Sequence, residues 1–163
     1  MYKRVLIPVD GSEIAESILP FILDIAGPLD LDVILLRVNQ PIPPMPAEGM
    51  SYFDIEDVEQ RREDAAEYLD RLGAAMRRSG VRVHTRVRRG DPVEEILAAA
   101  RDQAADLIAM TTHGRTGPAR LLWGSVAEGV LRHAPVPVFL LRQSEAELAR
   151  RRARDREMVG GSA

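Results

Sequence analysis

The sequence has no cysteine and is poor in lysine, in aromatic residues and in long apolar runs. Without cysteine, disulfides, thiolate zinc sites and cysteine nucleophiles are excluded. Lys3 is the only lysine, which excludes a phosphate loop of the type G-x-x-x-x-G-K-[ST]. Aromatic residues make up 4% of the chain and the formal net charge is −3, so neither base-stacking platforms nor a general attraction to nucleic acid is expected.

No apolar run approaches membrane-spanning length and the N-terminus carries no signal-peptide pattern, so we expect a cytoplasmic protein without membrane contacts. The three histidines, at positions 84, 113 and 133, are not spaced like the helical pairs that bind metals. We therefore expect no metal site made of protein ligands alone. The 163 residues, 45% of them hydrophobic, suffice for one sizeable core and hence one domain.

Short apolar runs rich in β-branched residues predict five strands. They are Arg4–Asp10, Asp32–Val38, Val81–Val87, Asp106–Thr112 and Pro137–Arg142. Four of these runs are almost continuously hydrophobic, which is typical of strands covered on both faces. The run Val81–Val87 alternates between apolar and polar residues and is predicted to lie at an edge of the sheet.

Helical segments lie between the predicted strands. Asp54–Ser79 has apolar residues on one face and ends before Gly80. A second helix starts with Asp91 as N-cap, followed by Pro92 and, three residues after the cap, by Glu94, which forms a capping box.

Two further helices are predicted. Ser12–Ala26 should be bent by Pro20, with these residues on its apolar face: Ile14, Ile18, Phe21 or Ile22, and Ile25. The last helix begins at Gly124-Ser125, and its apolar residues are Val126, Val130 and Leu131.

The regular alternation of strand and helix predicts an α/β fold with an open, five-stranded, doubly wound parallel sheet. We expect it to be Rossmann-like, with strand order 3-2-1-4-5. Such sheets bind ligands beyond the carboxyl ends of the strands, where the strand order reverses. Here that point lies between the first and fourth predicted strands, which end at Asp10 and Thr112.

Two segments fall outside this alternation. Residues 39–55 contain four prolines and are too long for an ordinary connection, so they form either a functional lid or a mobile loop. After residue 142 the chain becomes a charged tail, 143–163, with five arginines. The predicted organisation is therefore a domain over 1–142 followed by this tail.

Glycines gather after the fourth predicted strand, at Gly114, Gly117 and Gly124, the last of which precedes Ser125 at a helix start. The dinucleotide fingerprint G-x-G-x-x-G would follow the first strand, where this chain has "DGSE" instead. Two interpretations remain. The glycines either serve only to turn the chain, or clear backbone N–H groups for an anion at the start of the helix.

The segments "KRVLIPVDGSE" and "MTTHGRTGPARLLWGSVAEGVLRHAPVPVFLLR" resemble the universal stress protein family, over Met1 to Arg142. ATP-binding members of that family carry the pattern G-2x-G-9x-G-[ST]. In this chain Thr111 replaces the first glycine, whereas Gly114, Gly124 and Ser125 match the rest.

The resemblance implies a nucleotide site. Asp10 and Val38 would contact adenine, and Pro8 would line the pocket. Next to the ribose and the first phosphates would lie Thr111, Thr112, His113 and Gly114. The remaining phosphates would be held by Arg115, Gly117, Gly124, Ser125 and Val126. From its position Asp10 can also be an N-cap, with Glu13 three residues on.

The resemblance favours an ATP-binding regulatory protein of the stress response, with Mg²⁺ carried by the phosphates. No catalytic residues are predicted, and ATP hydrolysis should be slow at most because the chain offers no phosphate-loop lysine. The family commonly forms homodimers through the last strand, here Val136 to Arg142. The alternative is a nucleotide-free dimeric interaction module with the same fold. An adenylate-forming enzyme is less favoured, because no catalytic motif appears.

Overall fold

The computed structural model describes residues 2–41, 53–113, 124–144 and 147–150, and within these ranges the side chains of 53–56 and 113 are left aside. Its strands are β1 (Arg4–Pro8), β2 (Asp32–Asn39), β3 (Arg82–Arg89), β4 (Leu107–His113) and β5 (Val138–Gln143). They form one parallel sheet in the order β3-β2-β1-β4-β5. The predicted doubly wound α/β fold and the edge position of β3 are therefore confirmed.

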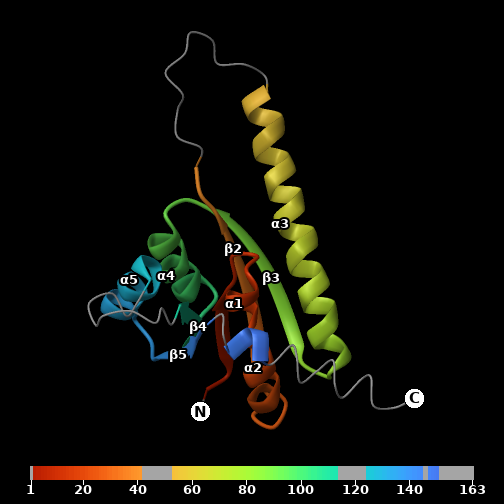
Figure 1. Cartoon of the computed structure of the whole chain (residues 1–163), viewed down its shortest axis with the longest axis vertical. Coiled ribbons are helices and arrows are strands. Elements are labelled where there is room, and N and C mark those ends of the chain that lie inside the picture. The colour runs from red at the N-terminus through yellow and green to blue at the C-terminus, as the bar shows by residue number, and fades with distance from the viewer. Residues whose placement is uncertain (1, 42–52, 114–123, 145–146, 151–163) are drawn as a thin grey trace.

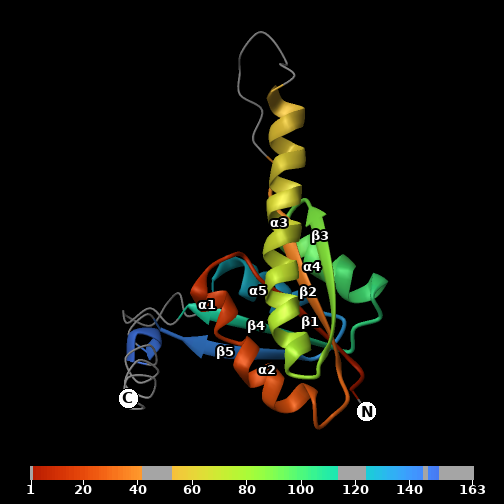
Figure 2. The same ribbon diagram turned by 90° about the vertical axis from the view of Figure 1, so that its right-hand side faces the viewer.

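Helices cover both faces of the sheet (Figures 1 and 2). On one face lie α1 (Glu13–Glu16), α2 (Leu19–Ala26) and α3 (Phe53–Arg78). On the other face lie α4 (Pro92–Asp102) and α5 (Ser125–His133). In both views the first turns of α3 extend past the sheet at the end where β2 and β3 finish.

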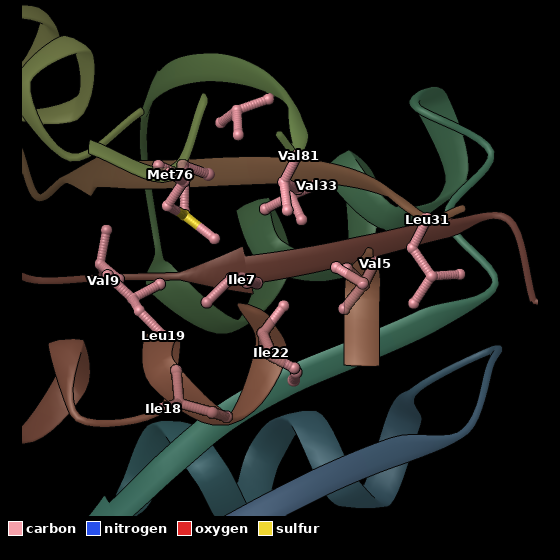
Figure 3. Packing of buried hydrophobic residues seen from close by; sticks show 14 of the residues in the cluster. Val5, Ile7, Val9, Ile18, Leu19, Ile22, Leu31, Val33, Met76 and Val81 are labelled. Carbon is pink, nitrogen blue, oxygen red and sulfur yellow. The ribbon is translucent and has the colours of Figure 1, made fainter. Parts of the chain in front are cut away.

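The sheet divides the core into two layers, and its central strand β1 contributes side chains to both. Val5 and Ile7 point toward α1, α2 and α3, together with Val33 of β2 (Figure 3). Leu6 points to the opposite layer, beneath α4 and α5. All three β1 side chains have no exposed surface, and burial of each stabilises the fold by about 1.5–3 kcal/mol.

The predicted helix Ser12–Ala26 is wrong in one respect, because the chain forms two helices rather than one bent helix. Pro20 lies in the first turn of α2, where its missing N–H costs no hydrogen bond. Ile14, Ile18 and Ile22 are buried, whereas Ile25 is 38% exposed. Ile25 was expected on the apolar face and is not buried there. Of the pair Phe21 or Ile22, it is Ile22 that is buried.

The predicted starts of α4 and α5 agree with the structure, but the burial of one side chain in α5 differs from the prediction. The Asp91 carboxylate accepts hydrogen bonds from the backbone N–H of Val93 at 2.9 Å and of Glu94 at 3.1 Å, which confirms it as the N-cap of α4. In α5 the buried stripe runs through Ala127 and Val130. Leu131 was expected in that stripe but is 40% exposed.

Candidate functional site

A cavity of about 760 Å³ lies at the carboxyl edge of the sheet, around the point where the strand order reverses. This volume falls within the range typical of small-molecule sites. Its walls come from the ends of β1, β2 and β4, from the starts of α4 and α5, and from the middle of α3. The cavity therefore touches both core layers across the end of the sheet.

The loop after β1 forms one wall and is held by its own side chains. Gly11 has φ +87°, a conformation that favours glycine, and this turns the chain from β1 toward α1. The Asp10 carboxylate accepts hydrogen bonds from the backbone N–H of Ser12 at 2.9 Å and from its hydroxyl at 2.6 Å. Ser12 in turn accepts from the backbone N–H of Ala15. The N-cap of α1 is thus Ser12, and the alternative role of Asp10 as N-cap is wrong.

Asp10 is held in its charged form. Partial removal from water acts to raise the pKa of Asp10, but the two hydrogen bonds from Ser12 and the nearby positive charge of Arg37 outweigh it. The pKa of Asp10 is therefore lowered below its ordinary value of 3.8. At neutral pH Asp10 presents only hydrogen-bond acceptors to the cavity.

The end of β4 and the start of α5 form the opposite wall. The hydroxyl oxygens of Thr111 and Thr112 are buried and have no hydrogen-bond partner in the described part of the chain. Gly124 is the N-cap of α5 and supplies no side-chain hydrogen bond to the first turn. Gly124, Ser125 and Val126 line the cavity, so the partly positive N-terminus of α5 faces it.

The end of β2 meets α3 at the third wall. The Asn39 side chain donates a hydrogen bond to the backbone carbonyl of Arg61 at 3.0 Å, which ties β2 to α3. The guanidinium carbon of Arg37 lies 5.9 Å from the centre of the Tyr68 ring. The Tyr68 hydroxyl donates a 2.8 Å hydrogen bond to the Glu16 carboxylate, and partial burial together with this bond raises the pKa of Tyr68.

The structure brings most of the predicted site residues together. Those that line the cavity are Pro8, Asp10, Val38, Thr111, Thr112, Gly124, Ser125 and Val126. His113 is the last residue of β4, and its side chain is outside the described part. Gly114, Arg115 and Gly117 also lie outside the described residues.

Several cavity residues were not predicted from the sequence, above all Arg37 and Tyr68. A signal for Arg37 was present, because it is the one charged residue inside the apolar run "VILLRV". Tyr68 lay in the helix Asp54–Ser79 without a distinguishing pattern. Among the described residues no group of three or more His, Asp or Glu side chains is arranged to hold a metal ion.

No helix in the described ranges combines the length and the apolar character that crossing a bilayer requires. The fold and the cavity together define a doubly wound α/β protein with a ligand-sized site at its topological switch point. Residues 1–142 match the model of the universal stress protein family. The chain belongs to this family.

Individual relatives support this family assignment. Universal stress protein MJ0531 of Methanocaldococcus jannaschii is 35% identical over 149 residues, which cover 90% of this chain and 86% of the relative. The solved structure of MJ0577, from the same organism, superposes with a TM-score of 0.74 at 30% identity, covering 88% of this chain and 97% of that one. An Arabidopsis thaliana family member, solved with AMP bound, shares the fold with a TM-score of 0.64 at 20% identity, covering 89% and 94%.

Proposed function

We propose that this protein binds ATP in the cavity at the carboxyl edge of the sheet and acts as a nucleotide-responsive regulatory protein. One observation carries the proposal. Thr111 and Thr112 line the same ligand-sized cavity as the start of α5, and their hydroxyl oxygens are buried without a partner among the described residues. Buried polar groups almost always have partners, and rotation of these two side chains toward a bound ligand would supply them here.

The proposed orientation follows from the charges of the walls. Asp10 is an acceptor and suits the exocyclic amino group of adenine, next to Val38 and Pro8. The helix start at Gly124, Ser125 and Val126 suits the phosphates, because its free N–H groups carry partial positive charge. Thr111, at the position of the family's first glycine, would offer a hydroxyl to the ribose. Mg²⁺ would arrive with the phosphates, held by their oxygens and by water.

Turnover of ATP is proposed to be slow at most. Fast phosphoryl transfer needs a cation at the phosphates and a group that positions the attacking nucleophile. Lys3 is the only lysine of the chain, and it lies before β1, at the opposite end of that strand from Asp10. The Arabidopsis relative of the same fold was solved with AMP bound, which supports a nucleotide as the ligand proposed here.

A titration tests the proposal. Trp123 is the only tryptophan and directly precedes Gly124, so its emission should change as ATP with Mg²⁺ is added. The melting temperature should rise in parallel, because a ligand that binds only the folded state stabilises it. GTP serves as the comparison nucleotide. The absence of both responses at millimolar ATP would contradict nucleotide binding and favour the interaction-module alternative.

Homodimerisation is part of both the nucleotide-binding proposal and the interaction-module alternative, and one observation supports it. Phe139 on β5 is 42% exposed, and β5 lies at one edge of the sheet. Apolar edge strands are readily covered by a second copy of the same strand around a two-fold axis. We propose that the segment Val136 to Arg142 forms this dimer contact.

A further inference from the structure

The cavity extends to the face of the sheet that α3 covers, away from the proposed phosphate contacts. Side chains alternate along β2, so Leu36 and Val38 pack in the layer of α4 and α5. Arg37 between them faces the other layer, over the ring of Tyr68. The residues that line the cavity on this side, here termed the α3-side lobe, are Gly11, Ala15, Arg37, Arg61, Asp64 and Tyr68.

Arg37 brings a positive charge to this lobe that acts on Asp10 through space but is in no close ion pair among the described residues. Its Nη1 atom is buried and has no hydrogen-bond partner in the described part of the chain. The nearby carboxylates are engaged elsewhere, Asp10 by Ser12 and Glu16 by the Tyr68 hydroxyl. Asp64 likewise accepts a hydrogen bond from Gln60 at 2.8 Å.

The guanidinium is also held in place. It stacks over the face of the Tyr68 ring, which is itself fixed by the hydrogen bond to Glu16. On the other side Nη1 lies close to Gly11, where a Cβ atom would be 3.4 Å from it. Because Nη1 is enclosed, a ligand in this lobe would have to accept its hydrogen bonds from Nε and Nη2.

Further arginines add to the positive potential beside the lobe. A second, smaller cavity of about 110 Å³ shares Asn39, Gln40 and Arg61 with the first. Its walls also include Arg62, Arg88 and Arg89. Arg62 is paired with Glu59, and Arg88 with Glu95 and Asp102, whereas no described ion pair involves Arg61 or Arg89. Such clustering of one sign of charge attracts anions.

We propose that the α3-side lobe is an anion subsite in which Arg37 binds a phosphate group distinct from the phosphates at the start of α5. The planar guanidinium donates two parallel hydrogen bonds to phosphate oxygens, which a lysine cannot match. This inference rests on the proposed function in one respect, because the phosphate at Arg37 and the proposed nucleotide would share one cavity. The phosphate can belong to the ribose of the bound nucleotide or to a separate phosphate ion, and the chemistry at Arg37 is the same.

The first arm of the test compares adenosine 3′,5′-bisphosphate with AMP by isothermal titration calorimetry. If the second phosphate belongs to the nucleotide, the bisphosphate binds about tenfold more tightly, as expected for a charge-assisted hydrogen-bonded pair. Arg37→Gln should bring the ratio of the two affinities close to one, and Arg37→Lys should keep only part of it. The matched control is Arg71→Gln, because Arg71 lies 5.7 Å from the same ring centre but does not line the cavity.

The second arm uses inorganic phosphate, with and without saturating AMP. Phosphate that binds alongside AMP in the parent and in Arg71→Gln, but not in Arg37→Gln, supports the subsite with a free phosphate as its ligand. Equal behaviour of parent and Arg37→Gln toward both probes overturns the subsite, whether or not ATP binds. Conversely, failure of every nucleotide to bind while phosphate binding still depends on Arg37 overturns the proposed function and leaves the subsite standing. Melting temperatures establish that each variant is folded.

Discussion

Gly129 of α5 packs against Val93 of α4 so closely that a Cβ atom on Gly129 would lie 2.7 Å from a Val93 methyl carbon. Gly129→Ala should therefore destabilise the protein by about 1 kcal/mol or more, because overpacking outweighs the gain in helix propensity. Urea unfolding followed by circular dichroism measures this change. Val93→Ala removes the clashing methyl groups. The double variant should therefore lose less free energy of unfolding than the sum of the losses in the two single variants. A Gly129→Ala protein more stable than the parent would contradict this packing.

At Gly124 the opposite holds, since a Cβ atom there would meet nothing within 4 Å and the backbone has φ −58°. Gly124→Val should lower the melting temperature only by the modest cost of replacing glycine at an N-cap, because the added group projects into open space. ATP affinity should fall to undetectable levels, because the same bulk would block the approach of phosphates to the helix start. Gly124→Ala is the graded comparison and should lose less affinity. Unchanged ATP binding by Gly124→Val would place the phosphates elsewhere.

The charge of Asp10 predicts a pH dependence. The pKa of Asp10 is lowered in the folded protein, so its ionised form stabilises the fold above the unfolded-state pKa of about 4. That contribution should be lost as the pH falls through the folded-state pKa. Asp10→Asn should therefore show a smaller loss of stability than the parent between neutral pH and the acid range, in unfolding experiments at a series of pH values. An identical loss in both proteins would contradict this role of Asp10.

Arg37 is expected to contribute to that lowered pKa. Arg37→Gln removes a positive charge near Asp10 and should raise its pKa, whereas Arg71→Gln should leave it nearly unchanged. Carboxyl ¹³C chemical shifts recorded across the titration of Asp10 report the value directly. Were the two variants to shift the pKa of Asp10 equally, the specific pairing of charges at the cavity wall would be refuted.

The proposed dimer predicts a change in oligomeric state. Phe139→Glu would place a charge in the contact between two copies of β5 and should produce monomers in analytical ultracentrifugation. Leu29→Glu is the matched control, because Leu29 is 45% exposed, close to the 42% of Phe139, and lies far along the chain from β5. A Phe139→Glu protein with the mass of the parent would exclude β5 as the contact.

The parts of the fold that follow from local pattern could be predicted from the sequence. The doubly wound parallel sheet followed from the alternation of strands and helices, and Asp91 from its capping pattern. The division into α1 and α2 could not be predicted in this way, because Pro20 is compatible both with a bend and with a new helix start. Choosing between them requires the packing of Ile22 and Ala26 against the sheet.

The candidate site was predictable to a similar degree. The residues that follow β1 and β4 were found because the ends of parallel strands have a known relation to ligand sites. Arg37 and Tyr68 were missed because their relation is formed only when α3 packs across β2, and no sequence spacing encodes a pair 31 positions apart in chain numbering. The role of Asp10 was ambiguous until the hydrogen bonds of Ser12 were known.

The strand order β2-β1-β4 at the cavity has a consequence for folding during synthesis. Because β4 joins β1 only after about a hundred intervening residues have been synthesised, a nascent chain ending before β4 lacks one entire wall. Ligand recognition should therefore emerge in a single late step, and a fragment stopping at residue 105 should be unable to capture nucleotide however well its first three strands assemble.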